Sequence, residues 1–144
     1  VEEGETPQQA AVREAVEELN IQPEQIDILG EIDYLVFERS TIHCFVGRLN
    51  LDWMTIVPNE EVARIFTVPL STLLTIQPVY YQLDSKVVPE CDFPFERLRG
   101  GISYPFNHQK RSIPFYEQLP ENIWGMTAQF THRFTEIINQ QTSP

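Results

Sequence analysis

Three glutamates near the start of the chain, Glu14, Glu17 and Glu18, have a spacing that suits a metal centre. On an α-helix, where successive residues turn by about 100°, these three side chains lie on one face. Like charges at this spacing repel by about 0.2–0.5 kcal/mol per pair, and no lysine in the segment offsets them. A hard divalent cation such as Mg²⁺ would do so, because it binds carboxylate oxygens together with substrate phosphates. A merely solvated acidic face is the alternative that the residues alone leave open.

The helix that must carry these glutamates has a clear start signal. Thr6 is suited to the N-cap, Gln9 three residues later completes a capping box, and Pro7 occupies the first helical position. The helix is therefore predicted to begin at Thr6 or Pro7. Its apolar stripe, roughly opposite the glutamates, consists of Val12, Ala15, Val16 and Leu19.

The order of these charged residues resembles the Nudix box. Glu5 is followed after seven residues by Arg13-Glu14, then after two more by Glu17-Glu18, and the run closes on aliphatic Ile21. The resemblance implies that Glu14, Glu17 and Glu18 hold Mg²⁺ or Mn²⁺. It also suggests that Arg13 pairs with carboxylates such as Glu5 and organises the site without touching substrate.

The chain departs from the family pattern in three places. Asn20 stands where the family has glycine, a mild change because Asn also tolerates the left-handed conformation at a helix C-terminus. Ala15 is small for the aliphatic position of the box. The opening glycine would precede Val1, so we expect the chain to start inside the box and to lack the strands that normally come before it.

A second acidic pair, Glu60-Glu61, precedes a predicted strand over residues 62–68. In a fold whose helix already presents three carboxylates, this pair is suited to supply a further metal ligand or the general base. Glu61 is slightly favoured over Glu60, and Glu14 is the other candidate base. A solvated loop pair remains the alternative.

Three further stretches, over residues 28–33, 59–70 and 123–128, resemble the coenzyme A diphosphatase branch of the Nudix hydrolases. This resemblance implies hydrolysis of a nucleoside diphosphate linked to another group, with coenzyme A giving 3′,5′-ADP and 4′-phosphopantetheine. The branch's own coenzyme A signature would lie upstream of the box. Two alternatives therefore stay open: another Nudix substrate such as ADP-ribose, NADH or a dinucleoside polyphosphate, or a non-catalytic Nudix-shaped ligand-binding module.

The composition sets limits on partners and compartment. A net charge of −11 argues against binding nucleic acid through its phosphates, which requires Lys and Arg. No apolar run is long enough to span a membrane. Two unpaired cysteines, Cys44 and Cys91, favour a reducing, cytoplasmic compartment, and the three histidines (His43, His108 and His132) have no metal-ligand spacing. A small-molecule substrate is expected, and a homodimer is left open.

The remaining pattern predicts an α+β fold in a single Nudix domain over residues 1–144. A hairpin is expected from a strand over 26–37, broken near Gly30, a turn at 38–40 and a strand over 41–49. Short helix 70–75 and a terminal helix over 122–139 follow the strand at 62–68. The aromatic-rich segment 77–117 is expected to form two or three strands and a long loop, which either wall a substrate pocket or only pack onto the sheet. The family's sandwich would place a mixed sheet between helices.

Overall fold

The computed structural model describes residues 1–37, 40–84, 88–106 and 110–142. The chain forms two compact units, one of residues 1–77 together with residue 129 onward, and the other of residues 78–128. Each unit is described by itself below. The single domain over residues 1–144 stays a prediction.

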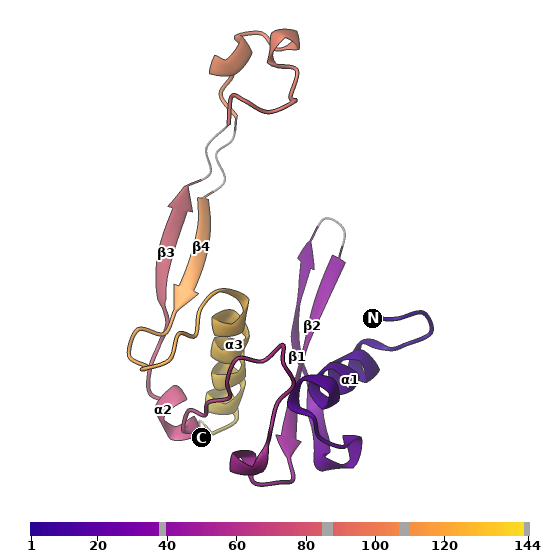
Figure 1. The fold of residues 1–144 in the computed structure, drawn as a ribbon. Helices are drawn as coiled ribbons and strands as arrows, with labels where there is room; N and C mark the ends of the chain where they lie inside the picture. The colour runs from indigo at the N-terminus through magenta and orange to yellow at the C-terminus, as the bar shows by residue number, and fades with distance from the viewer. Residues whose placement is uncertain (38–39, 85–87, 107–109, 143–144) are drawn as a thin grey trace. The chain divides into compact units, whose positions relative to one another are not determined.

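Helix α1 (Pro7–Leu19) begins where the capping signal predicts (Figure 1). The Thr6 hydroxyl accepts a hydrogen bond from the Gln9 backbone N–H at 3.2 Å, and the Gln9 side-chain oxygen accepts one from the Thr6 N–H at 2.8 Å. Asn20 ends the helix in the left-handed conformation, with φ 53°, and its backbone N–H donates a hydrogen bond to the Val16 carbonyl. Both ends of α1 are therefore as the sequence predicts.

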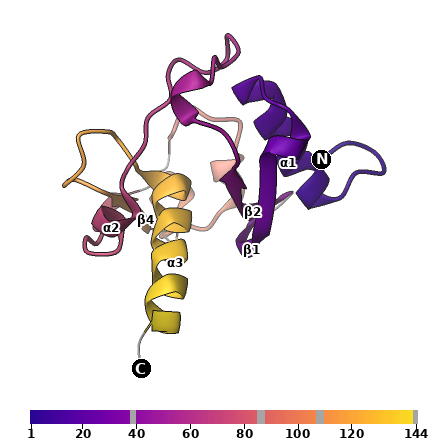
Figure 2. The ribbon, with the colours of Figure 1, turned by 90° about the horizontal axis from the view of Figure 1, so that it is seen from below.

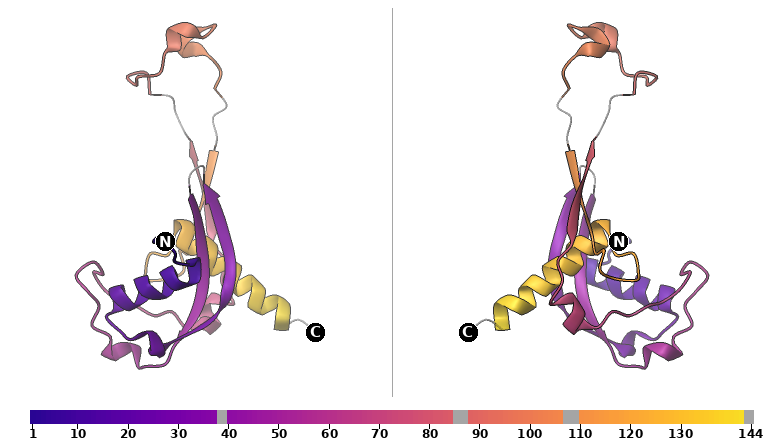
Figure 3. Two further views of the ribbon diagram at one scale, coloured as in Figure 1. Left: turned by 90° about the vertical axis from the view of Figure 1, so that its right-hand side faces the viewer. Right: turned by 90° about the vertical axis from the view of Figure 1, so that its left-hand side faces the viewer.

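Strands β1 (Ile26–Phe37) and β2 (Ser40–Leu49) form the predicted antiparallel hairpin. The register shifts between Ile28 and Gly30, as the break near Gly30 predicts, and shifts again between Glu31 and Asp33. The predicted turn at 38–40 falls mainly on residues 38 and 39, outside the described residues. Helix α1 contacts β2, and Figures 2 and 3 show the helix lying against this hairpin.

The chain after β2 is less regular than predicted. A short 3-10 helix (Trp53–Thr55) follows β2. The predicted strand over residues 62–68 is wrong because this segment has no regular structure. Its Val, Ile and Phe residues favour strands, but a strand also needs a neighbour to complete its hydrogen bonds, and neither described sheet includes this segment. The predicted short helix is present as α2 (Leu70–Leu73).

Residues 78–128 form the second unit. Strands β3 (Val79–Asp84) and β4 (Lys110–Phe115) pair antiparallel, and two 3-10 helices (Phe95–Arg97 and Gly101–Ser103) lie between them in sequence. The prediction of two or three strands with a long loop is confirmed. The terminal helix α3 (Gly125–Thr142) starts in this unit, slightly later than predicted. Buried apolar residues among the described part of this unit include Tyr116, Ile123 and Ala128.

Few side chains are buried among the described residues of the first unit. They are Ala10 on α1, Ile21 after it and Thr135 on α3. Arg133 of α3 lies 3.9 Å from the Asp33 carboxylate on β1, and the Asn139 amide donates to the Leu74 carbonyl at 3.5 Å. These contacts attach the later part of α3 to the hairpin and to the end of α2.

Helices combined with antiparallel sheets confirm the α+β class and agree with a Nudix-like fold. The described residues form two separate two-stranded sheets in place of the expected mixed sheet. Each sheet pairs two consecutive strands of the chain, β1 with β2 and β3 with β4, and both pairs run antiparallel. A mixed sheet would need a parallel neighbour, which no described segment supplies. Among the helices of the described ranges, none is long and apolar enough to cross a bilayer.

Candidate functional site

The loop before α1 is tied to the helix through Glu5. Its carboxylate accepts hydrogen bonds from the Glu2 backbone N–H at 2.9 Å and from Arg13 Nε at 3.0 Å. The Glu5 side chain is only 14% exposed. The hydrogen bond from Arg13, followed by that from the Glu2 backbone, lowers the pKa of Glu5. In turn, the carboxylates of Glu5 and Glu14 raise the pKa of Arg13. The predicted ion pair is present, and its organising role stays a prediction.

The same guanidinium also contacts two of the three predicted metal ligands. Arg13 Nη2 lies 2.9 Å from Glu14 Oε1, and Nη1 lies 3.2 Å from Glu17 Oε2. These two carboxylates are 57% and 55% exposed, far more than Glu5. Arg13 therefore bridges one sheltered carboxylate and two that face water.

The third predicted ligand, Glu18, connects α1 with the loop that carries the second acidic pair. The Glu18 backbone carbonyl accepts a hydrogen bond from the Asn59 N–H at 2.9 Å. The Asn59 side chain accepts one from the Glu61 N–H at 3.0 Å, and the resulting Asx turn fixes the backbone of residues 59–61. The main chain of Glu60 and Glu61 thus lies beside the C-terminal turn of α1.

The sequence alone did not predict the hydrogen bond between Asn59 and Glu18, although it indicated the turn at residues 59–61. Asn followed by two polar residues is typical of an Asx turn, so the local shape of residues 59–61 was predictable. The contact between Asn59 and Glu18 was not, because 41 positions separate them and neither side chain indicates the pairing. It is this contact that brings Glu60-Glu61 to the predicted site.

The carboxylates share one region but are not assembled into a ligand cluster. Across the described part of the chain, no three His, Cys, Asp or Glu side chains are gathered closely enough to hold a metal ion. The donor chemistry nevertheless fits Mg²⁺ or Mn²⁺, since all candidate ligands are carboxylate oxygens. A positive group already lies between Glu14 and Glu17, namely the Arg13 guanidinium. Ligation by Glu14, Glu17 and Glu18 stays a prediction.

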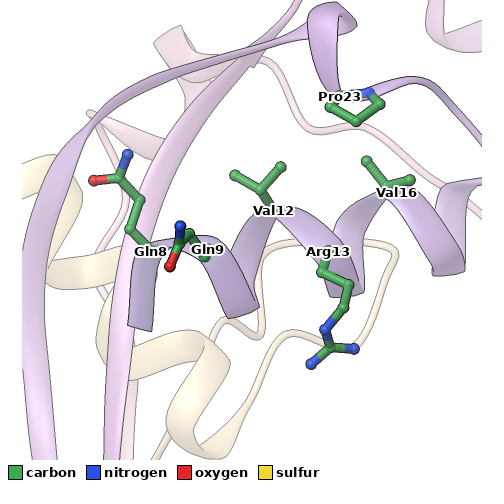
Figure 4. Close-up of a pocket in the computed structure, with 6 residues that line it drawn as sticks. All are labelled: Gln8, Gln9, Val12, Arg13, Val16 and Pro23. Carbon is green, nitrogen blue, oxygen red and sulfur yellow. The ribbon is translucent and has the colours of Figure 1, made fainter. Parts of the chain in front are cut away.

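A depression of about 350 Å³ lies along α1, and Arg13 is among the residues that line it. Its lining includes Val12 and Val16 from the predicted apolar stripe and Pro23 from the connector. In Figure 4 the two valines point toward Pro23, whereas the Arg13 guanidinium points away from them. Val12 and Val16 are thus only half-buried, whereas Glu14, Glu17 and Glu18 are exposed.

Of the described cysteines and histidines, Cys91 is exposed, whereas Cys44, His43 and His132 lie on strand β2 or helix α3. Cys44 is half-buried on β2, and burial raises the pKa of its thiol. His43 Nδ1 lies 2.6 Å from the Glu31 carboxylate on the neighbouring strand, and His132 pairs with Glu136 one turn along α3. His108 lies outside the described residues.

A loop that carries Glu5, followed by a capped helix with Arg13 and a row of three glutamates, on an α+β fold, is the arrangement of the Nudix class of domain. The chain matches the family profile described as the NUDIX domain over residues 1–91, more than half its length. It therefore belongs to the Nudix family.

Two curated relatives are similar to this chain along most of its length. The protein called "Uncharacterized Nudix hydrolase NudL" of Photorhabdus laumondii is 28% identical over 129 residues, which cover 89% of this chain and 58% of that protein. "Nudix hydrolase 3" of Caenorhabditis elegans is 21% identical over 145 residues, covering 94% of this chain and 56% of that protein. The chain thus spans slightly more than half the length of either relative.

Proposed function

We propose that this protein is a metal-dependent diphosphatase that hydrolyses a nucleoside diphosphate linked to another group. The observation that carries the proposal is the arrangement of acidic groups around α1. Glu14 and Glu17 converge on one cationic group, and a backbone hydrogen bond attaches the loop of Glu60 and Glu61 to the carbonyl of Glu18. The NUDIX domain match and the two Nudix hydrolase relatives support the same reaction class.

Each acidic residue has a proposed role. Glu14, Glu17 and Glu18 hold Mg²⁺ or Mn²⁺, which when bound neutralises the diphosphate and lowers the pKa of a water. Glu61 or Glu14 accepts the proton of the attacking water, with Glu60 as the less favoured candidate. A general base of this kind contributes about 10²–10⁴-fold to the rate.

For the substrate, we favour coenzyme A or its derivatives, which would give 3′,5′-ADP and 4′-phosphopantetheine. The support is the resemblance of residues 28–33, 59–70 and 123–128 to the coenzyme A diphosphatase branch. Within the last stretch, Trp124 stacks on Phe115 with ring centroids 5.5 Å apart and keeps 54% of its surface exposed. The cytoplasm is the proposed compartment, on the basis of the two unpaired cysteines.

The test is a substrate panel with the purified full-length protein and Mg²⁺ or Mn²⁺. Coenzyme A, ADP-ribose, NADH and a dinucleoside polyphosphate are compared by kcat/KM, and the products are identified by mass. We expect the highest value for coenzyme A and cleavage only in the presence of the ion. Preference for ADP-ribose would overturn the substrate choice. Binding without turnover of every compound would favour a non-catalytic Nudix module.

A further inference from the structure

We infer that Arg13 acts as a place-holding cation, which binds Glu14 and Glu17 in the metal-free protein and releases them when a divalent ion binds, while keeping Glu5. This inference concerns the regulation of the metal site and rests on the proposed function. It assigns to Arg13 a competition with the metal, in addition to the pairing with Glu5 predicted from the sequence.

The geometry divides the contacts of Arg13 into two groups. Toward Glu5, Nε and Nη2 donate at 3.0 and 3.4 Å to a carboxylate that is 14% exposed and is also held by the Glu2 backbone. Toward the helix, the terminal nitrogens reach Glu14 and Glu17 at 2.9 and 3.2 Å. The guanidinium thus uses its fork of donors on three carboxylates at once, which a lysine ammonium matches poorly.

Exposure decides which contacts are released. Glu14 and Glu17 are 57% and 55% exposed, so their ion pairs with Arg13 are screened by water and individually weak. The contact with Glu5 is more sheltered and is supported by a second hydrogen bond to the same carboxylate. A divalent ion that approaches Glu14 and Glu17 therefore displaces the weaker pair of contacts and leaves the stronger one in place.

Charge explains why such a place-holder is useful here. Glu14, Glu17 and Glu18 lie within one turn of α1 and repel one another, and α1 carries no second basic residue. Without the ion, Arg13 offsets part of this repulsion. With the ion bound, the same contacts would compete with ligation. The metal affinity is accordingly set lower than the carboxylates alone would give.

If Arg13 competes with the metal, replacing it should strengthen Mn²⁺ binding. If Arg13 only held the site in shape, replacing it should weaken Mn²⁺ binding. We would measure Mn²⁺ binding to the full-length protein without substrate, by calorimetry and by the EPR signal of free Mn²⁺. Arg13→Lys keeps the charge but loses the fork, and Arg13→Gln loses both. We expect both variants to bind Mn²⁺ about three- to tenfold more tightly than the wild type, as the loss of weak ion pairs predicts. Unchanged or weaker binding in the folded variants would overturn the inference.

Arg48 on β2 offers matched controls. Its guanidinium is exposed and pairs with Asp27 of the neighbouring strand β1 at 2.6 Å. Arg48→Lys and Arg48→Gln repeat the same chemical changes outside the acidic site. We expect less than a twofold change in Mn²⁺ affinity for either. An equal gain in the Arg48 variants would show an effect of net charge alone and would also overturn the inference.

A second measurement on the wild-type protein does not depend on how the variants fold. The side-chain N–H resonances of Arg13 are followed by NMR during titration with Mg²⁺ and are assigned by their loss in Arg13→Lys, or by selective labelling if that variant is unfolded. Nη1 donates to Glu17, whereas Nη2 also donates to Glu5, which the inference keeps. We therefore expect slowly exchanging Nη1 protons in the metal-free protein, lost at saturating Mg²⁺, with the Nε–H signal retained. Nη1 signals that are absent without Mg²⁺, or unchanged with it, would contradict the inference.

The outcomes separate this inference from the proposed function. If wild-type protein binds Mn²⁺, Glu17→Gln abolishes the binding and Arg13→Lys weakens it, the metal site stands and the place-holder role fails. If neither the wild type nor the Arg13 variants bind Mn²⁺, both the proposed metal site and the inference fail.

Discussion

Two regions of this molecule are rich in side-chain contacts and differ in what those contacts can specify. Around α1, a few charged groups make directional hydrogen bonds, and Arg13 reaches three carboxylates at 2.9–3.2 Å. In the second unit, the aromatic cluster of Phe93, Phe95, Tyr104 and Phe106 packs edge to face with ring centroids 5.0–6.1 Å apart. The charged contacts near α1 fix the positions of individual atoms, whereas the aromatic contacts of the second unit only pack side chains against one another. We therefore expect changes near α1 to alter chemistry and changes in the aromatic cluster to alter stability.

The largest effect is expected from Glu17→Gln or Glu18→Gln. Either substitution removes a proposed ligand of the metal ion. The bound ion stabilises the charge of the transition state by several kcal/mol, so kcat should fall about a thousandfold. Helix content by circular dichroism should not change, because both side chains are exposed. Glu24→Gln, an exposed glutamate in the 3-10 helix Pro23–Gln25, is the control and should keep full activity. Undiminished turnover in both α1 variants would contradict the expectation that changes near α1 alter the chemistry.

The next effect separates the two glutamates of the attached loop. Glu61→Gln should lower kcat about a hundredfold if Glu61 is the general base, whereas Glu60→Gln should change it only severalfold. Both variants keep the Asx turn, which uses the Glu61 backbone N–H and the Asn59 side chain. The pH dependence of kcat shows whether a base has been lost. A larger loss of kcat in Glu60→Gln than in Glu61→Gln would assign the general base to Glu60. A small loss in both variants would leave Glu14 as the candidate base.

In the aromatic cluster, Phe106→Leu should cost stability without affecting turnover. Phe106 contacts three other rings, and each aromatic pair contributes about 0.5–1.5 kcal/mol, so we expect a loss of about 2 kcal/mol. Tyr104→Leu, which removes one such pair, should cost less. Hydrogen exchange of residues 93–106 measures the loss locally. A clear rise in KM for coenzyme A with unchanged stability would instead assign these rings to a substrate pocket.

The smallest effect is the acid sensitivity of the contact between Glu5 and Arg13. Because the pKa of Glu5 lies below its ordinary value of 4.5, the folded protein binds fewer protons there than the unfolded chain. The stabilisation is therefore present above pH 4.5 and is lost as the pH falls through the lowered pKa. Glu5→Gln should unfold at a lower temperature than the wild type at pH 7, and the difference should shrink toward pH 3. A difference that is constant with pH would contradict this assignment.

The parts of the site that were predictable from sequence are those fixed by short-range contacts. The Thr6 and Gln9 cap, the left-handed Asn20 and the Glu5 to Arg13 pair all join residues within eight positions of one another. Helix geometry and capping chemistry decide such contacts without knowledge of the rest of the fold.

The features that could not be predicted depend on contacts between residues that are far apart in the sequence. Residues 62–68 have strand-forming side chains, yet they remain irregular because neither described sheet includes them. Likewise, aromatic residues between positions 77 and 117 indicate packing, but nothing in their spacing shows that Phe106 meets three other rings. The hydrogen bond from Asn59 to Glu18 also depends on a distant partner.

The central claim is that the carboxylates of α1 hold divalent ions around a diphosphate. Its most direct test is a crystal of the full-length protein with Mn²⁺ and a non-hydrolysable diphosphate analogue, in which anomalous scattering locates the metal. We predict a Mn²⁺ peak about 2 Å from oxygens of Glu14, Glu17 and Glu18, bridging to the analogue. A bound analogue with these three carboxylates facing bulk water, and manganese elsewhere, would contradict the account.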